Sequence, residues 1–425
     1  MRMRRLPFLL LCLVMILVVG NPVFSGPSKL TVWADSFFTP QWQGGQGPIL
    51  DKIWKQFEKE NNAVIDLQLV PYPEFQAKLL SALRAKTAPD AVIADQYWLA
   101  SMIKTGGVQE ISAYWPEKER KDFFPWAVEG TTVGGKIYGI WYTTDARVLY
   151  YRKDLLQKGG FNEPPGTWDE LVKTAQALHT SDVYGLGMVF QGEGGMCTLL
   201  IDFWSLGGEL TDADGKPIFH LGKNKEALIK VLNFYDQLYN KYKVTPKDSV
   251  AYTTENDMNQ RILAGGYNMF FGGGWQIGII QDNLPPKDAK NWEIAVRPVP
   301  PGGKPSSMAG GFDLNVLASN PTTKRLAAKF IQHLAKPNNM AKFAAASRGL
   351  PVRMSVWEND SFFATDHYMQ QYHAILDFAK TRPNSVVYPI ISEKVMVALG
   401  QVLSGQKNAS QAIDDAGKAV LAAMQ

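Results

Sequence analysis

Apolar residues along the chain follow two spacings, one typical of helices and one typical of strands. Ile49, Ile53 and Phe57 recur four residues apart, which predicts a helix over 49–60. Apolar and polar residues alternate over 65–69, as in a half-buried strand. The short apolar run before Asp95 predicts a buried parallel strand. Strand and helix alternate in this way within the first third of the chain, which predicts an α/β fold.

The same pattern continues through the second half of the chain. Thr167 and Glu170 have the spacing of a capping box and predict the start of a helix. Four prolines and two glycines crowd into 298–305, which predicts a boundary loop. After about residue 320 the pattern is mostly helical. The other predicted elements are strands at 29–34, 148–152 and 268–271, and helices at 75–83, 97–105, 171–178 and 228–239.

The first 25 residues are typical of a secretory signal peptide. Three arginines precede an apolar run from Leu6 to Val19, and small or turn-forming residues follow up to Ser25. The run is shorter than the about 20 apolar residues of a membrane-spanning helix. We therefore predict cleavage after Ser25 and a protein outside the cytoplasm. Cys12 follows three leucines rather than small residues, so we do not expect a lipid anchor.

Composition narrows the classes of function. A chain of 425 residues, 46% hydrophobic and 20% charged, has ordinary globular composition for two or three domains. The formal net charge is +4, but beyond residue 25 the chain has 41 basic and 40 acidic residues. Without a polybasic run we expect no nucleic-acid partner. Cys197 is the only cysteine beyond residue 25, which excludes an intramolecular disulfide in the secreted chain.

The sequence lacks the motifs of common metal and nucleotide sites. Its five histidines are scattered, and a single cysteine cannot build a cysteine-rich zinc site. Residues 272–274 are three glycines after a predicted strand, but they lack the dinucleotide-binding spacing. They fit a close backbone approach better. We therefore expect neither a metal nor a cofactor.

Tryptophans and aspartates gather where predicted strands end. Ligands of α/β proteins bind beyond the carboxyl ends of strands. A flat ring covers the apolar face of a sugar, and carboxylates form strong hydrogen bonds with its hydroxyl groups. Any one of these residues could equally belong to the core or cap a helix, but together they favour a carbohydrate site. They are Trp33, Trp98, Trp141, Trp275, Asp35, Asp95 and Asp145.

Paired carboxylates also allow a second interpretation, in which they are the acid and the nucleophile of a glycosidase. No known catalytic motif flanks the three aspartates, and their sequence spacing does not give their separation in space. We therefore expect binding without turnover, and we predict no catalytic residue.

Residues 139–156, GIWYTTDARVLYYRKDLL, closely resemble the signature region of family 1 extracellular solute-binding proteins. These are the sugar-binding subunits of ABC importers, such as maltose- and trehalose-binding proteins. Each further match is weak alone, but together they follow the family's order and cover most of the chain beyond residue 25. They lie at 29–33, 88–95, 166–171, 203–208, 271–275, 310–312 and 349–353.

The resemblance implies a two-lobe α/β fold of the type II periplasmic-binding-protein class. A ligand cleft lies between the lobes, and three hinge crossings join them. We expect crossings near 143–146 and 293–299, and a sugar that touches both lobes to stabilise the closed form. The expected N-terminal lobe comprises 26–142 and 299–336, and the expected C-terminal lobe comprises 143–298 and 337–425.

The resemblance also implies ligand-binding residues on both lobes. It places Asp95 and Phe312 on the first lobe, Trp275 and Arg348 on the second, and Asp145 at the first crossing. Phe312 stands where many family members have tryptophan. We expect stacking from Trp275 and Phe312, hydroxyl contacts from Asp35, Asp95, Asp145 and Arg348, a further ligand-binding position at Gly311, and secondary contributions from Tyr97, Trp98 and Tyr388.

The function implied by the resemblance is capture of a sugar or oligosaccharide outside the cytoplasm. A monomer would deliver it to the transmembrane subunits of an ABC permease. A non-sugar solute stays open as an alternative, whether a polyol, a glycerol phosphodiester or a polyamine. The few basic candidates argue against phosphate, whereas the several aspartates leave a cationic ligand open. A secreted glycoside-active enzyme is the third alternative.

Overall fold

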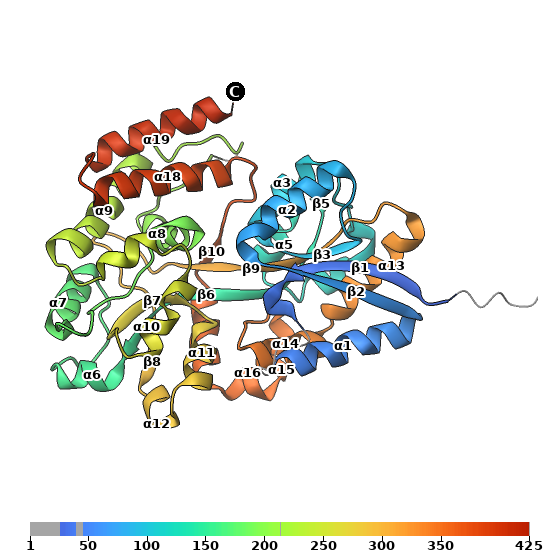
Figure 1. Ribbon diagram of the computed structural model, residues 1–425, viewed down its shortest axis with the longest axis horizontal. Helices are drawn as coiled ribbons and strands as arrows, with labels where there is room; N and C mark the ends of the chain where they lie inside the picture. Colours follow the sequence, from blue (N-terminus) through green and yellow to red (C-terminus); the bar gives the residue numbers. More distant parts are fainter. Residues whose placement is uncertain (1–25, 40–45, 213, 425) are drawn as a thin grey trace, which may run out of the picture.

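The computed structural model describes residues 26–39, 46–212 and 214–424. The signal peptide predicted over 1–25 lies outside these described residues. Two lobes are joined by long strands (Figure 1), and we call the one with the N-terminal strands the first lobe and the other the second lobe. Among the described residues, no helix is both long enough and apolar enough to cross a membrane.

The first lobe is built on parallel strands in the spatial order β2 (Ala63–Val70), β1 (Ser28–Asp35) and β3 (Ala91–Asp95). Turns of 3-10 helix follow β1 and β3 directly, η1 (Ser36–Phe38) and η2 (Gln96–Trp98). Helices bury their apolar faces on this sheet, as Phe57 and Leu79 show. The further elements are α1 (Gln46–Asn61), α2 (Tyr72–Ala85), α3 (Leu99–Lys104), η3 (Ser112–Tyr114), α4 (Glu117–Arg120), α5 (Pro125–Glu129), β4 (Thr132–Val133), β5 (Lys136–Ile137), α13 (Pro321–Leu334) and α14 (Pro337–Ser347).

The second lobe packs helices around short strands. Its strands are β7 (Met269–Gly273), β8 (Trp292–Ala295) and β10 (Ala379–Thr381). The long C-terminal helices pack against each other and against α8 and α9 (Figure 1). The helices are α6 (Lys153–Lys158), α7 (Trp168–Leu178), α8 (Gly192–Ser205), α9 (Gly222–Asp236), η4 (Gln237–Lys241), η5 (Lys247–Ala251), η6 (Glu255–Met258), α10 (Asn259–Leu263), α11 (Gln276–Asn283), α12 (Pro286–Ala289), α17 (His367–Leu376), α18 (Tyr388–Leu403) and α19 (Ala409–Ala423).

Two antiparallel strands, β6 (Ile140–Arg152) and β9 (Ser307–Val316), run from one lobe to the other. The first half of β6 pairs with β9, and its second half pairs with β7 and β8 in the second lobe. The end of β9 pairs with β3 in the first lobe, and its beginning pairs with β10. Each strand therefore belongs to both lobes, and Asp145 lies at the first crossing as predicted.

The chain passes between the lobes a third time through α15 (Met354–Asn359) and α16 (Ser361–Thr365). Ser355 at the start of α15 is held by Asp122 of the first lobe. The next helix, α17, packs on β8 in the second lobe, where the hydroxyl of Tyr368 donates to the carbonyl of Trp292. The predicted two-lobe fold with three crossings is confirmed.

The second crossing comes later than the sequence predicts. Val299 pairs with Thr167, and the backbone N–H of Lys304 donates to the carbonyl of Ser205, so 298–305 still lies on the second lobe. The chain changes lobes in β9. The predicted lobe boundary at 299 and the predicted crossing near 293–299 are therefore wrong. The pairing of β9 with β3 determines where the chain enters the first lobe. The prolines of 298–305 only mark the end of the preceding strand, β8.

Helix α14 lies on the first lobe, which corrects a second prediction. The sequence assigns residues from 337 onward to the second lobe. The contacts of this helix are with α1 and α13 of the first lobe. Phe343 on α14 stacks on Tyr142, with ring centroids 4.9 Å apart, and on Phe38 at 5.7 Å. This aromatic contact buries the apolar face of the helix on the first lobe.

Most predicted elements are present with slightly longer bounds. β1, β2, β3, α1 and α2 all cover the predicted residues. The capping box at α7 is formed: the hydroxyl of Thr167 accepts from the N–H of Glu170, whose carboxylate accepts from the N–H of Thr167. The strand predicted over 148–152 is the second half of β6 only.

Candidate ligand-binding site

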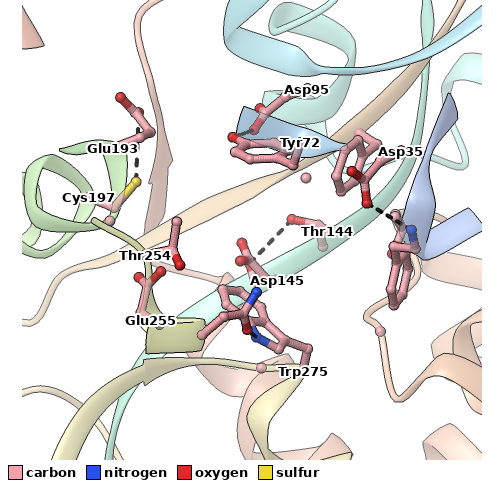
Figure 2. Close-up of a pocket in the computed structure, with 18 of the residues that line it drawn as sticks. Asp35, Tyr72, Asp95, Thr144, Asp145, Glu193, Cys197, Thr254, Glu255 and Trp275 are labelled. Carbon is pink, nitrogen blue, oxygen red and sulfur yellow. Dashed lines mark hydrogen bonds between the residues drawn. The ribbon is translucent and has the colours of Figure 1, made fainter. Parts of the chain in front are cut away.

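A cavity of about 320 Å³ lies between the two lobes beside β6 and β9 (Figure 2). The first lobe lines it with residues at the ends of β1 and β3 and at the start of α2. The second lobe lines it with the first turns of α8 and η6 and with the loop between β7 and α11. Residues distant in sequence therefore face one space.

Seven of the ten residues predicted to bind ligand line this cavity. Those on the first lobe and the crossing strands follow from strand order, since β1, β3, β9 and β6 are neighbours in the sheet. On the second lobe, Trp275 comes from the loop after β7. Arg348 directly follows α14 and therefore lies on the first lobe, not on the second as predicted, with its side chain close to Gly278 of α11. The seven are Asp35, Asp95, Asp145, Trp275, Gly311, Phe312 and Arg348.

Tyr97, Trp98 and Tyr388 do not line the cavity. Trp98 is fully buried beside the rings of Tyr72 and Phe75. Tyr97 and Tyr388 pack edge-on against each other behind the cavity wall, with centroids 5.6 Å apart. The turn η2 directs the side chains of Tyr97 and Trp98 away from the cavity. Proximity to a strand end does not by itself orient a side chain toward the ligand space.

Parallel strands place Asp35 and Asp95 at the same edge of the first-lobe sheet. Each is the last residue of its strand, and Asp95 pairs with Phe312 of β9. Asp35 also caps η1, because its Oδ1 accepts the backbone N–H of Phe37 at 2.8 Å. The carboxyl ends of the strands thus bring polar groups to the cavity, as expected for an α/β fold.

Gly311 permits the close approach of β9 to β6 next to Phe312. Its φ is +122°, and a β-carbon there would lie 2.0 Å from the carbonyl oxygen of Thr143. A side chain is therefore excluded at this position. The ring of Phe312 packs edge-on against Phe38, with centroids 5.0 Å apart, and one side of it lines the cavity.

One charged triad lies where β6 enters the second lobe. Asp145 accepts from Arg147 at 2.8 Å and from the backbone N–H of Gly310 at 2.8 Å. The Nε of Arg147 lies 3.2 Å from Glu255, and its guanidinium covers the indole of Trp275 at 4.5 Å. Two carboxylates and one ring thus hold Arg147 in a fixed orientation at the cavity wall.

A second triad joins the two lobes. Arg382, which follows β10, pairs with Asp95 of the first lobe at 2.5 Å and with Glu193 of the second lobe at 3.1 Å. The hydroxyl of Tyr72 donates to Asp95 at 2.7 Å, and that of Tyr388 donates to Glu193 at 2.5 Å. Arg382 is buried, so its charge is compensated by protein groups rather than by water.

Burial raises the pKa of both strand-end aspartates above the usual aspartate range. For Asp95, the nearby Arg382 guanidinium opposes this increase. For Asp35, the opposing groups are backbone N–H groups, that of Phe37 first. A ligand that donates hydrogen bonds or carries positive charge would therefore stabilise the ionised form of Asp35.

The sequence did not predict four charged residues of the cavity. Arg147 had a usable signal, because it lies two residues after Asp145 in a strand and so shares its face. Glu193, Glu255 and Arg382 had none, since their partners are distant in sequence. Tyr72 and Phe37 were missed as well.

The described residues contain no group of three or more histidines, cysteines or acidic residues suited to a metal ion. Cys197 lines the cavity with a free thiol whose pKa is raised by burial. The chemistry of the cavity is therefore hydrogen bonding by fixed charges together with contact against the rings of Trp275 and Phe312.

Comparison with known sequences gives the same class of protein along most of the chain. The family model for bacterial extracellular solute-binding proteins matches residues 52–370. A probable ABC transporter-binding protein of Deinococcus radiodurans is 28% identical over 309 residues, covering 70% of this chain and 71% of that protein. A maltooligosaccharide ABC transporter solute-binding lipoprotein of Streptococcus pneumoniae is 23% identical, covering 93% of this chain and 89% of that protein.

Solved structures show the same two-lobe architecture. The maltose-bound T. maritima MalE3 is 26% identical, with a TM-score of 0.80 over 92% of this chain and 99% of that chain. A solute-binding protein of Thermotoga lettingae bound with α-D-tagatose is 27% identical, with a TM-score of 0.81 over 92% and 98%. With the family model spanning most of its length, this chain belongs to the bacterial extracellular solute-binding proteins.

Proposed function

We propose that the protein captures a sugar or a short oligosaccharide outside the cytoplasm and delivers it unchanged to an ABC permease. The observation that carries this proposal is the interlobe cavity, where the rings of Trp275 and Phe312 face the same space as ionised groups held in fixed positions. Rings suit the apolar faces of sugars, and carboxylates and guanidinium groups suit their hydroxyl groups. The relatives that bind maltose, tagatose and maltooligosaccharide support the same class of ligand.

Within this proposal, Asp35, Asp95 and Asp145 accept hydrogen bonds from sugar hydroxyl groups, and Arg348 donates to sugar oxygens. The cavity of about 320 Å³ is at the small end of the range for ligand pockets, which favours a short sugar. Arg147 and Arg382 each already contact two carboxylates, so they are poorly placed to bind a phosphodiester. A neutral or cationic solute fits the cavity better than an anionic one.

Delivery would depend on closure of the lobes about β6, β9 and the α15–α16 segment. A ligand held by both lobes stabilises the closed form, because only that form offers both sets of contacts. A permease can then distinguish loaded from empty protein. Export by a signal peptide cleaved after Ser25 and a monomeric receptor complete the proposal.

A screen of neutral mono- and oligosaccharides by thermal shift and calorimetry tests this function. Binding to the folded form raises Tm by an amount that grows with the logarithm of the ratio of ligand concentration to Kd. Chromatography after incubation should return each stabilising sugar intact. Shorter products would establish the glycosidase alternative, and stabilisation by a polyol or a polyamine alone would move the protein to a non-sugar class.

A further inference from the structure

The positive and negative charges of the residues that line the cavity are unequal in number. Five carboxylates and three guanidinium groups face it: Asp35, Asp95, Asp145, Glu193 and Glu255 against Arg147, Arg348 and Arg382. Each triad of one arginine and two carboxylates carries a surplus negative charge. Arg348 lies over the ring of Phe362 and 4.0 Å from Asp366, which does not line the cavity. Carboxylates therefore outnumber guanidinium groups in the cavity lining, five to three.

Asp35 is the carboxylate of the cavity whose negative charge is least compensated by a nearby cation. Its neighbour Asp95, at the end of the adjacent strand, has Arg382 as a partner. No lysine, arginine or histidine of the described residues forms an ion pair with Asp35, although its side chain is buried and only 8% of the residue is exposed. The structure thus offers an internal comparison of two strand-end carboxylates, one with an arginine partner and one held by backbone N–H groups.

The surroundings of Asp35 suit a cation. Phe37, Tyr72 and Phe312 line the cavity with it, and the rings of Tyr72 and Phe312 meet edge-on with centroids 6.5 Å apart. Aromatic faces attract ammonium groups through their quadrupole, and a carboxylate supplies the opposite charge. Figure 2 shows Asp35 on the side of the cavity away from Glu193, with Tyr72 between the two.

We propose that the physiological ligand is an amino sugar with a free, protonated amine, and that its ammonium group binds Asp35. This inference rests on the proposed function and narrows its substrate class. A neutral sugar would donate hydroxyl hydrogen bonds to Asp35 but would supply no positive charge, so this buried carboxylate would still have no cationic partner. An ammonium group removes that penalty and adds a charge-assisted hydrogen bond.

The test compares isosteric pairs in which one hydroxyl group is replaced by an amine. Calorimetry is run with glucose, galactose, mannose, maltose and cellobiose and with their 2-amino and 6-amino derivatives. N-acetylated derivatives serve as the uncharged amine control. At least one amino sugar should bind about tenfold or more tightly than its neutral parent, since hydrogen bonds to charged groups contribute more than neutral ones. N-acetylation should abolish that advantage.

Two variants test whether Asp35 is the carboxylate that binds the ammonium group. Asp35→Asn keeps an oxygen that accepts the N–H of Phe37 but removes the charge, so the ratio of amino-sugar affinity to neutral-sugar affinity should fall to about one. Asp90→Asn is the matched control, because Asp90 also accepts a backbone N–H, that of Thr31 at 2.8 Å, but does not line the cavity. It should behave as the wild type.

The outcomes separate this inference from the proposed function. Neutral sugars that bind as tightly as their amino counterparts would overturn the amino-sugar inference and leave sugar capture intact. An amine preference that persists in Asp35→Asn would overturn the assignment to Asp35. Binding of none of these sugars would contradict both proposals.

Discussion

Trp275, which we propose stacks on the sugar, also contacts its neighbours at the cavity wall. Its indole lies under the guanidinium of Arg147, and its Nε1 donates to Asn256 at 3.0 Å. Trp275→Ala should weaken sugar binding by about 1–3 kcal/mol, as for a buried aromatic anchor, while Tm without ligand changes little. Trp126→Ala is the control, because Trp126 is similarly half-buried but outside the cavity. Equal sugar affinity of the wild type and Trp275→Ala would show that the indole ring does not contact the ligand.

Asp313 carries a prediction about pH. It is fully buried on β9, its Oδ1 has no hydrogen-bond partner among the described residues, and burial raises its pKa to about 8. The folded protein then holds a proton that the unfolded chain releases near pH 4. Stability should therefore fall as pH rises from about 4 to 8, the window between the two pKa values.

Asp313→Asn tests this, because it cannot lose that proton. The variant should exceed the wild type in free energy of unfolding at pH 8, with the difference shrinking toward pH 4. Urea denaturation at several pH values measures it. Parallel pH profiles of the two proteins would show that Asp313 does not titrate in this range.

At the scale of the elements, the contact between β6 and β9 depends on Gly311. Gly311→Ala would force a β-carbon against the carbonyl of Thr143 and strain a backbone with φ of +122°. We expect a loss of more than about 1 kcal/mol in stability, together with weaker ligand binding because Phe312 is displaced. Gly302→Ala is the control: its φ is +79°, but no atom lies within 4 Å of the added carbon. If both variants lose the same stability, backbone strain rather than the clash is responsible.

For the whole molecule, Arg382 is the buried ion-pair residue that ties the lobes together. Arg382→Gln leaves Asp95 and Glu193 close to each other without their cation, so the lobes should separate. Small-angle scattering of the free protein should show a larger radius of gyration than the wild type, and saturating sugar should reduce the radius of both.

Arg353→Gln is the matched control for this change. Arg353 is also buried and paired with two carboxylates, Glu119 and Asp122, but these precede the first crossing. Its loss should lower stability without opening the lobes. An unchanged radius in Arg382→Gln, with the fold intact by circular dichroism, would show that other contacts hold the lobes.

The sequence alone determined the local elements and much of the cavity. Apolar residues that alternate with polar ones, or that recur every four residues, form patterns that depend only on residues close in sequence. This is why β1, α1, β2 and the capping box at Thr167 were predicted. Strand ends marked Asp35 and Asp95, because parallel strands share an edge. The order of motifs placed Trp275 and Phe312 in one site, and the structure brings both to the cavity.

Tertiary structure decided where the chain changes lobes and which charges meet. Residues 140–146 are buried on both faces of β6, so their pattern carries no alternation that would mark the first half of this strand. The packing of Phe343 on Tyr142 assigned α14 to the first lobe. Arg382 and its partners Asp95 and Glu193 are separated by 287 and 189 residues. The spacing of residues along the chain cannot specify such an ion pair, because its two members come into contact only after both lobes have folded against each other.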